Sequence, residues 1–211
     1  MKTPFVQVLG LCGSLRRGSF NLGLLHAAQE LAPRNMQISL HDIKALPFFC
    51  PDDGAGGDPE PVRKLRNAIA AADALLIATP EYNAGIPGVL KNAIDWVSQP
   101  LEQSVLRGKP TAILGCTTGR SGTERAQIQL RQTLLYTRAK PLPFPELLVS
   151  RSHAKFDMMG ELSDKATRDA LSHLLLRLRE WTLAVQTAVI ATIPLPRGAS
   201  SPPSASIAHV R

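Results

Sequence analysis

The sequence contains few cysteines, since its 211 residues include only Cys12, Cys50 and Cys116, which lie far apart. A disulfide framework or a zinc site needs more cysteines at closer spacing, so neither is predicted and no metal is expected. Free thiols are typical of the reducing cytoplasm, where we expect this protein to act. Each cysteine is more consistent with a small core residue than with a reactive thiol.

Long apolar runs are also missing. A transmembrane helix needs about 20 consecutive apolar residues, whereas Asp73 interrupts the run at 68–80 and Gln186 interrupts the last predicted helix. The apolar part of the N-terminal segment is too short for a signal sequence and contains Pro4 and Gln7. We therefore expect no membrane partner, and we interpret the N-terminal segment as a buried strand.

Aromatic residues make up only 5% of the chain, and acidic residues are scarce in part of its second half. Residues 1–100 hold nine basic and nine acidic side chains, so the net charge of +7 arises beyond them. Seven basic residues and one acid, Glu124, lie between Arg107 and Lys140. This cluster indicates either a solvated basic helix face or attraction for an anionic ligand. A nucleic acid partner is not expected, because no aromatic residues alternate with the arginines to stack on bases.

Apolar strand patterns and amphipathic helix patterns alternate along the chain. The predicted strand at 73–80 is apolar on both faces, which is typical of a parallel sheet covered by helices. The alternation predicts an α/β doubly wound sandwich formed by one domain, residues 1–193. Residues 194–211 are rich in Pro, Ser and Ala and predict a disordered tail. The expected strands are 5–12, 36–43, 73–80, 111–118 and 142–150, and the expected helices are 20–32, 61–72, 87–97, 123–136 and 165–192.

The stretch GLCGSLRRGSFN, residues 10–21, joins the first predicted strand to the first predicted helix. In a doubly wound sheet such a turn lies at the ligand-binding edge and aims backbone N–H groups at an anion. Its glycines do not match the G-x-G-x-x-G dinucleotide fingerprint, and no G-K-[ST] of a nucleotide triphosphate loop follows. The remaining donors suit a monophosphate ester. They are Ser14, Arg16, Ser19 and Asn21.

Two other interpretations of this loop are possible. It could be an ordinary helix entry, in which Ser19 or Asn21 only caps the helix. It could also belong to a small tyrosine phosphatase, whose loop has the pattern C-x5-R. Counted from Cys12, however, the arginine position is Gly18, and the candidate acid Asp58 comes too early in the chain. A phosphatase is therefore disfavoured.

A second stretch, TPEYNAGIPGVLKNAIDW at residues 79–96, closes the third predicted strand and opens the next helix. Pro80 ends the strand, and Pro87 suits the first turn of the helix. Gly85 and Gly88 let the backbone approach a flat ligand closely. The sequence therefore predicts a second ligand-binding loop at the same edge of the sheet.

Together, GSLRRGSFN and TPEYNAGIPGVLKNAIDW resemble the NAD(P)H-dependent FMN reductase family, flavodoxin-like flavoproteins that include quinone and chromate reductases. The resemblance covers residues 5–190. It implies a five-stranded parallel sheet in the order 2-1-3-4-5, with helices on both faces. It also implies that Ser14, Arg16, Ser19 and Asn21 hold the FMN phosphate and that Pro80, Glu81, Tyr82 and Asn83 line the isoalloxazine ring.

The third loop, CTTGRSGTER, departs from the family pattern, which often has a Gly-Gly pair where this chain has SGTER. By resemblance, Thr117, Thr118 and Gly119 are expected beside the flavin ring. Arg120 and Arg125 become candidates for contacts with a phosphate of NADPH. A salt bridge or a subunit contact is the alternative role for these two arginines.

The implied strand order places the third strand between the strands that end at Cys12 and Cys116. These cysteines should then lie roughly 9.5 Å apart, which is two strand spacings. That separation exceeds the reach of a disulfide. We therefore expect no redox pair.

The resemblance implies an enzyme that passes hydride from NADPH or NADH to FMN, and then to an acceptor such as a quinone, chromate, an azo compound or free flavin. The flavin itself would be the reactive centre, with no catalytic side chain, so the protein need only orient the reactants, exclude water and tune the flavin. Two alternatives are a non-enzymatic electron carrier and an FMN reductase that supplies reduced flavin to a monooxygenase. Family members pair through helices near the flavin, which implies a homodimer or homotetramer here.

Overall fold

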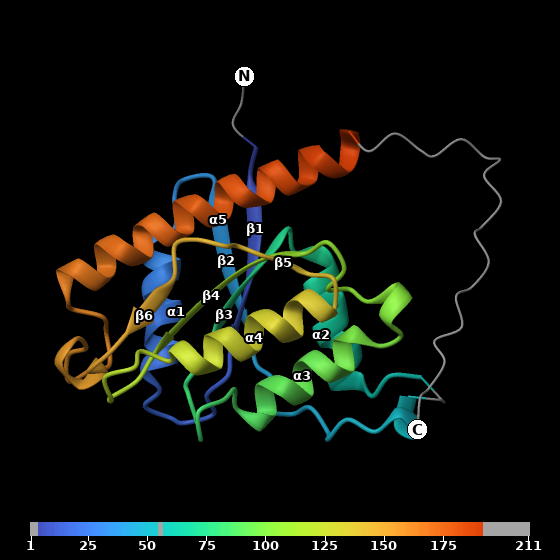
Figure 1. Ribbon diagram of the computed structural model, residues 1–211, viewed down its shortest axis with the longest axis horizontal. Helices are drawn as coiled ribbons and strands as arrows, with labels where there is room; N and C mark the ends of the chain where they lie inside the picture. Colours follow the sequence, from blue (N-terminus) through green and yellow to red (C-terminus); the bar gives the residue numbers. More distant parts are fainter. Residues whose placement is uncertain (1–3, 55–56, 192–211) are drawn as a thin grey trace, which may run out of the picture.

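A parallel sheet of six strands crosses the computed structural model, which describes residues 4–54 and 57–191 (Figure 1). The strands are β1 (Val6–Cys12), β2 (Met36–His41), β3 (Ala74–Ala78), β4 (Pro110–Cys116), β5 (Lys140–Pro141) and β6 (Leu147–Val149). The α-helices are α1 (Phe20–Leu31), α2 (Glu60–Ala71), α3 (Gly88–Ser98), α4 (Glu124–Tyr136) and α5 (Lys165–Ala191). Three short 3₁₀ segments are η1 (Pro51–Gly54), η2 (Leu101–Gln103) and η3 (Ser152–Ala154).

The strand order is β2-β1-β3-β4-β5, and β6 also pairs with β4. This confirms the predicted order 2-1-3-4-5. The prediction of a single fifth strand at 142–150 is wrong, because two short strands form this edge of the sheet, β5 beside the start of β4 and β6 beside its end. Pro143 and Pro145 lie between them and lack the N–H donors that a continuous ladder needs.

Both faces of the sheet are covered by helices. One core cluster packs α1 and α5 against the sheet, and the other packs α2, α3 and α4 against the opposite face (Figure 1). In β3, Leu76 belongs to the first cluster, whereas Leu75 and Ile77 belong to the second. Each such buried side chain contributes about 1.5 to 3 kcal/mol to folding. The predicted burial of this strand on both faces is confirmed.

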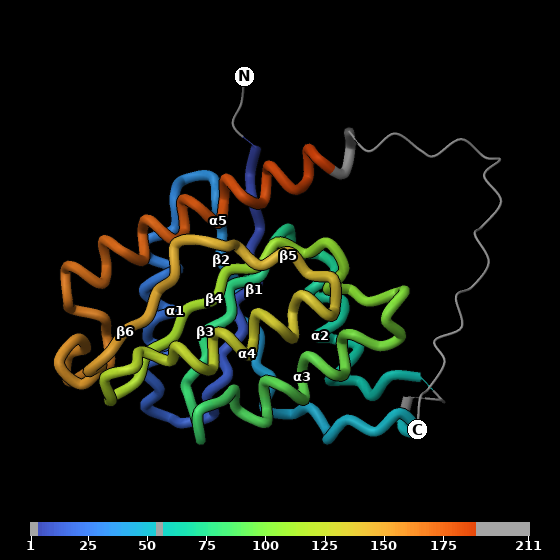
Figure 2. Tube along the Cα trace, in the orientation of Figure 1, coloured from blue at the N-terminus to red at the C-terminus, as the bar shows by residue number. Residues whose placement is uncertain are grey.

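Helix α5 lies along one face of the sheet and reaches back to the N-terminal strand (Figure 2). Its apolar stripe is buried at Leu171, Leu174, Leu175 and Leu178. Arg179 donates a hydrogen bond to the carbonyl of Pro4 at 2.9 Å. No helix within residues 4–54 and 57–191 is long and apolar enough to cross a membrane. The tail predicted at 194–211 lies outside the described residues.

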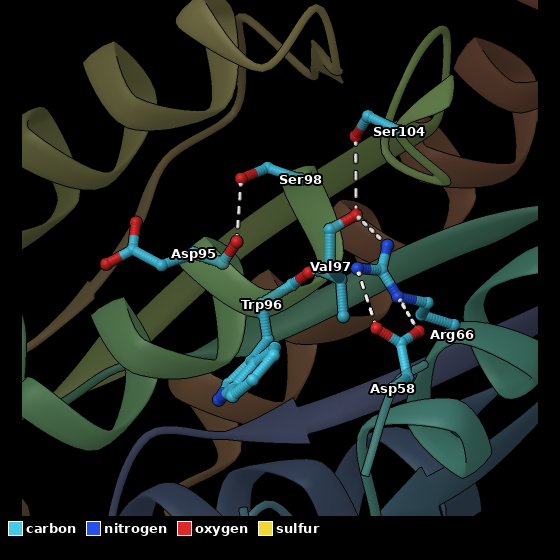
Figure 3. A network of polar contacts seen from close by, with 7 residues as sticks. All are labelled: Asp58, Arg66, Asp95, Trp96, Val97, Ser98 and Ser104. Atoms are coloured by element: carbon cyan, nitrogen blue, oxygen red, sulfur yellow. Dashed lines mark hydrogen bonds and ion pairs between the residues drawn. The ribbon is translucent and has the colours of Figure 1, made fainter. Parts of the chain in front are cut away.

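A polar network joins α2 to the end of α3 (Figure 3). The guanidinium of Arg66 donates to the carbonyl oxygens of Trp96 at 2.6 Å and Val97 at 3.3 Å, and it forms an ion pair with Asp58. These contacts satisfy carbonyl groups that the helix leaves free at its C-terminus. They fix the far end of α3, whose other end follows the loop after β3.

Candidate functional site

The loops that follow β1, β3 and β4 come together at the carboxyl edge of the sheet (Figure 2). The cleft between them is lined by nine of the site residues predicted from the sequence and by three others. The predicted residues Asn83, Gly119 and Arg120 belong to the same loops and Arg125 lies in the first turn of α4, but none of these four lines this cleft. The predicted residues that line it are Ser14, Arg16, Ser19, Asn21, Pro80, Glu81, Tyr82, Thr117 and Thr118, and the others are Phe20, Cys116 and Ser152.

The first loop offers backbone donors to a ligand. Within the described part of the chain, none of the six backbone N–H groups from Ser14 to Ser19 donates a hydrogen bond. Ser19 is the N-cap of α1, and its hydroxyl oxygen accepts a hydrogen bond from the N–H of Leu22 at 3.3 Å. Free N–H groups at a helix N-terminus form a site for an anion, and they fit the phosphate of FMN. Capping by Ser19 and anion binding by the loop are therefore compatible.

Asn21 connects the first loop to the third. Its side-chain nitrogen donates to the carbonyl oxygen of Cys116 at 3.0 Å, and its side-chain oxygen accepts from the N–H of Cys116 at 3.0 Å. Asn21 is buried and does not cap α1. The amide thus ties the entry of α1 to the end of β4. The sequence does not indicate this pairing, because the two residues are far apart along the chain.

The second loop contains a tight hairpin. Tyr82 and Gly85 exchange two backbone hydrogen bonds of 3.0 Å, and the two residues between them, Asn83 and Ala84, have φ angles of 50° and 61°. Tyr82 is half-exposed at the cleft. The carboxylate of Glu81, which also lines the cleft, accepts a hydrogen bond from the N–H of Ala126 in α4 at 3.1 Å. Glu81 therefore has a structural partner.

One functional candidate was missed by the sequence analysis. Gln129, on the exposed side of α4, accepts a hydrogen bond from the N–H of Ile86 at 2.7 Å through its side-chain oxygen. A Cβ atom at Gly85 would lie 2.7 Å from the same oxygen, so a side chain at this position would displace the Gln129 amide from its present place. No local pattern around Gln129 indicates a partner in the second loop.

The third loop is held from behind by the segment that follows β6. Ser152 donates its N–H to the carbonyl of Thr117 at 3.0 Å, and Arg151 donates to that of Gly119 at 2.9 Å. Arg120 and Arg125 are exposed, and neither forms an ion pair within the described residues. Their guanidinium groups can therefore meet an anionic ligand.

The cysteines beside the cleft are free thiols. Burial raises the pKa of Cys12, and it raises the pKa of Cys116 to about 12. Both side chains are protonated at neutral pH and are poor nucleophiles. Asp58, the candidate acid of a phosphatase, is paired with Arg66 instead. As predicted, β3 separates β1 from β4 in the sheet.

A larger cavity, of about 700 Å³, lies near the C-terminal end of α3. Phe49, Trp96 and Pro100 are among its lining residues, and none of the predicted site residues lines it. The Arg66–Asp58 pair at its wall is already engaged with the end of α3. Size alone therefore does not identify the functional site, and the convergence of three loops with free donors makes the smaller cleft the candidate site.

Comparison with known proteins identifies the family. The family model of NADPH-dependent FMN reductases matches residues 6–154. The chain belongs to this family. As an FMN reductase family member it is an enzyme, an NAD(P)H-dependent oxidoreductase that uses FMN, and not a carrier alone.

The sequences of individual relatives align with most of this chain. An NAD(P)H-dependent FMN reductase of Pseudomonas aeruginosa is 48% identical over 176 residues, which cover 83% of this chain and 95% of that protein. A 2-hydroxy-1,4-benzoquinone reductase of a Burkholderia species is 40% identical, covering 83% of this chain and 96% of the relative. The flavoenzyme FerB, an NAD(P)H:acceptor oxidoreductase of Paracoccus denitrificans, has a similar structure, with a TM-score of 0.78 and 34% identity over 85% of this chain and 98% of FerB.

Proposed function

We propose that this enzyme reduces quinones with NAD(P)H and keeps FMN bound in the three-loop cleft throughout the reaction. The observation that carries the proposal is the row of unpaired N–H groups from Ser14 to Ser19 at the entry of α1, in a cleft that two further loops complete. A relative that is 40% identical is named a 2-hydroxy-1,4-benzoquinone reductase, which supports a quinone as acceptor. When bound, FMN supplies the redox chemistry, accepting hydride and passing electrons to the acceptor.

The protein's first task is to hold the FMN phosphate. Ser14 and Ser19 offer hydroxyl groups and the loop backbone offers N–H groups, while Arg16 lines the same cleft with an exposed guanidinium. A fixed cation and several neutral donors suit a phosphate monoester without a metal ion. We assign Asn21 a different role from the one implied by the resemblance, since its amide is paired with Cys116 and fixes the loop.

The second task is to place the flavin ring and exclude water. The backbone N–H groups of Glu81 and Thr118 donate no hydrogen bond within the described residues, so they are available to the polar edge of the ring. Tyr82 and Pro80 form a wall of the cleft. Because the carboxylate of Glu81 accepts a hydrogen bond from α4, we assign it no proton-transfer role. We assign Tyr82 to the wall of the cleft and likewise give it no proton-transfer role.

Replacement of Arg16 tests the phosphate site. Arg16→Ala is expected to weaken FMN binding by about 1.5 to 3 kcal/mol, the range for a hydrogen bond to a charged group. Riboflavin, which lacks the phosphate, should bind equally well to wild type and variant. Fluorescence titration of the apoprotein measures both affinities, with the exposed Arg34→Ala as a charge-matched control. Equal losses for FMN and riboflavin would contradict the assignment.

Anaerobic reduction tests the function. One equivalent of NADPH or NADH is expected to bleach the FMN-loaded protein, and a quinone should restore the yellow colour, because hydride transfer requires the nicotinamide to stack within reach of the flavin. If Arg120 and Arg125 meet the 2′-phosphate, NADPH should reduce faster than NADH, and added salt should diminish the difference. Flavin that stays oxidised with both nucleotides would refute the proposal. Flavin that is lost on gel filtration would favour FMN as a substrate for release to a monooxygenase.

We also propose that the enzyme is a homodimer or homotetramer that associates through α4. This helix exposes three large apolar side chains, Ile128, Leu135 and Tyr136, and Phe144 nearby in sequence is 71% exposed. Such exposed apolar groups are typical of an interaction surface. Sedimentation should give a species of two or four times 22.8 kDa, and Leu135→Glu with Tyr136→Glu should reduce it to the monomer. A wild-type protein that sediments only as a monomer would exclude this assembly.

The cysteine side chains bear on the cellular location of the enzyme. All three cysteines, Cys12, Cys50 and Cys116, are free. Free thiols are typical of reducing compartments. We therefore propose that the enzyme acts in the cytoplasm, where NAD(P)H is available.

A further inference from the structure

The hairpin of the second loop is held in an unfavourable backbone conformation. Asn83 and Ala84 both have left-handed φ angles, 50° and 61°. Asparagine tolerates this region, whereas for alanine it costs about 1 to 2 kcal/mol. Only two backbone hydrogen bonds, between Tyr82 and Gly85, close the hairpin itself. Strained segments of this kind persist when the surrounding structure holds them in place.

Two side-chain contacts with α4 hold the hairpin on either side. Before it, the carboxylate of Glu81 accepts a hydrogen bond from the N–H of Ala126 at 3.1 Å. After it, the N–H of Ile86 donates to the side-chain oxygen of Gln129 at 2.7 Å. The absence of a side chain at Gly85 leaves the space that this oxygen occupies. Both ends of the hairpin are therefore bonded to the same helix.

Helix α4 depends on the hairpin in return. Its N-cap residue, Thr123, has a left-handed φ of 72° and makes no side-chain capping bond to the helix N–H groups. Instead, the Thr123 hydroxyl accepts a hydrogen bond from the side chain of Gln127. Glu81 supplies the missing acceptor from another loop, and its negative charge is favourable at a helix N-terminus. The contact thus stabilises the helix and the loop together.

We propose that Glu81 and Gln129 are positioning residues that fix the Tyr82–Gly85 hairpin against α4 and so hold the flavin ring for hydride transfer. This inference rests on the proposed FMN site. Since the third loop runs directly into α4, the bonds join the two loops that flank the cleft into one rigid unit. The hydrogen-bond donors of the second loop then face the ring in a fixed geometry before any reactant arrives.

Gln129 gives the sharper test, because it is exposed on α4 and does not line the cleft. Gln129→Leu removes the acceptor, and Gln129→Glu keeps an oxygen at the same place. Gln29→Leu is the matched control, because Gln29 is an exposed helical glutamine whose side chain donates to one backbone group, the carbonyl of Ile38, and also bonds the His26 ring, both away from the cleft. The readouts are the Kd for FMN, the visible circular dichroism of bound flavin, and kcat and KM for NADPH.

Gln129→Leu is expected to raise the Kd for FMN by about 3- to 10-fold, the effect of one hydrogen bond, and to alter the flavin dichroism. Gln129→Glu should restore both properties, and Gln29→Leu should leave them unchanged even if it lowers stability. A rise in KM for NADPH that the Gln29 control lacks would support the same conclusion. In the other contact, Glu81→Gln should bind FMN better than Glu81→Ala, because it retains an acceptor.

The outcomes separate this inference from the proposed function. If wild type binds FMN and Gln129→Leu matches it in Kd and dichroism, the positioning role is wrong and the FMN site stands. If Gln129→Glu behaves like Gln129→Leu, the acceptor oxygen is not responsible and the inference also fails. If wild type itself does not bind FMN, the proposed site fails and this inference fails with it.

Discussion

A Gly115→Ala variant is expected to lose about 3 kcal/mol of folding free energy or more, at the upper end of the range for overpacked positions. Gly115 lies in β4, one residue before the third loop. A Cβ atom there would fall far inside contact distance of the carbonyl oxygen of Thr79 and the hydroxyl of Thr123. The first is a backbone atom and cannot rotate away, so the end of β3 or the entry of α4 must shift.

Thermal unfolding followed by circular dichroism measures the effect, and a loss of this size in a domain this large lowers Tm by about 6 to 12 °C. Gly88→Ala in α3 is the matched control, because no atom lies within 4 Å of a Cβ built at that position. The control should be as stable as wild type. Equal stability of the two variants would show that β4 can move away from the loop after β3 at little cost.

Asn21→Leu is expected to destabilise the protein by about 2 to 4 kcal/mol and to weaken FMN binding as well. The substitution leaves the N–H and the carbonyl of Cys116 buried without their partners. Each unsatisfied group costs about 1 to 3 kcal/mol. FMN affinity falls because the phosphate loop loses its connection to the third loop.

Urea titration gives the stability change, which should lower the midpoint without changing the slope. Asn92→Leu is a close control, since Asn92 also bonds two backbone groups, the N–H of Phe49 at 2.7 Å and the carbonyl of Pro47 at 2.8 Å, away from the cleft. Both variants should lose stability, but only Asn21→Leu should lose FMN affinity. An unchanged FMN affinity in Asn21→Leu would mean that this amide serves folding alone.

Much of the fold can be predicted from local patterns. The continuous apolar run of β3 predicts a strand that is buried on both faces, and the leucine stripe of α5 predicts a helix that is buried on one face. Both predictions follow from residue spacing alone. The edge formed by β5 and β6 could not be divided correctly, because apolar residues recur at 142, 144 and 147–149 while Pro143 and Pro145 interrupt the ladder. Strand pairing at the edge of a sheet depends on which backbone N–H groups lie opposite carbonyl groups of the neighbouring strand. The tertiary structure decides which groups lie opposite one another.

For the candidate site, the sequence predicts the three loops that meet at the cleft but not the hydrogen-bond partner of each side chain. Ser19 has both the position and the chemistry of a cap, and its neighbours in sequence show this. Asn21, Glu81 and Gln129 instead make their decisive hydrogen bonds with Cys116, Ala126 and Ile86, which are 43 or more residues away. Spacing along the chain carries no information about such partners.

The position of α5 has a consequence for biosynthesis. During translation α2, α3 and α4 leave the ribosome before α5, so the sheet face that they cover can close while the chain is still growing. The opposite face, which includes Val6 and Val8 of β1 and Leu76 of β3, completes its core only with Leu171 to Leu178. The nascent protein therefore carries one apolar face that α1 covers only in part until residues 171–178 have been made.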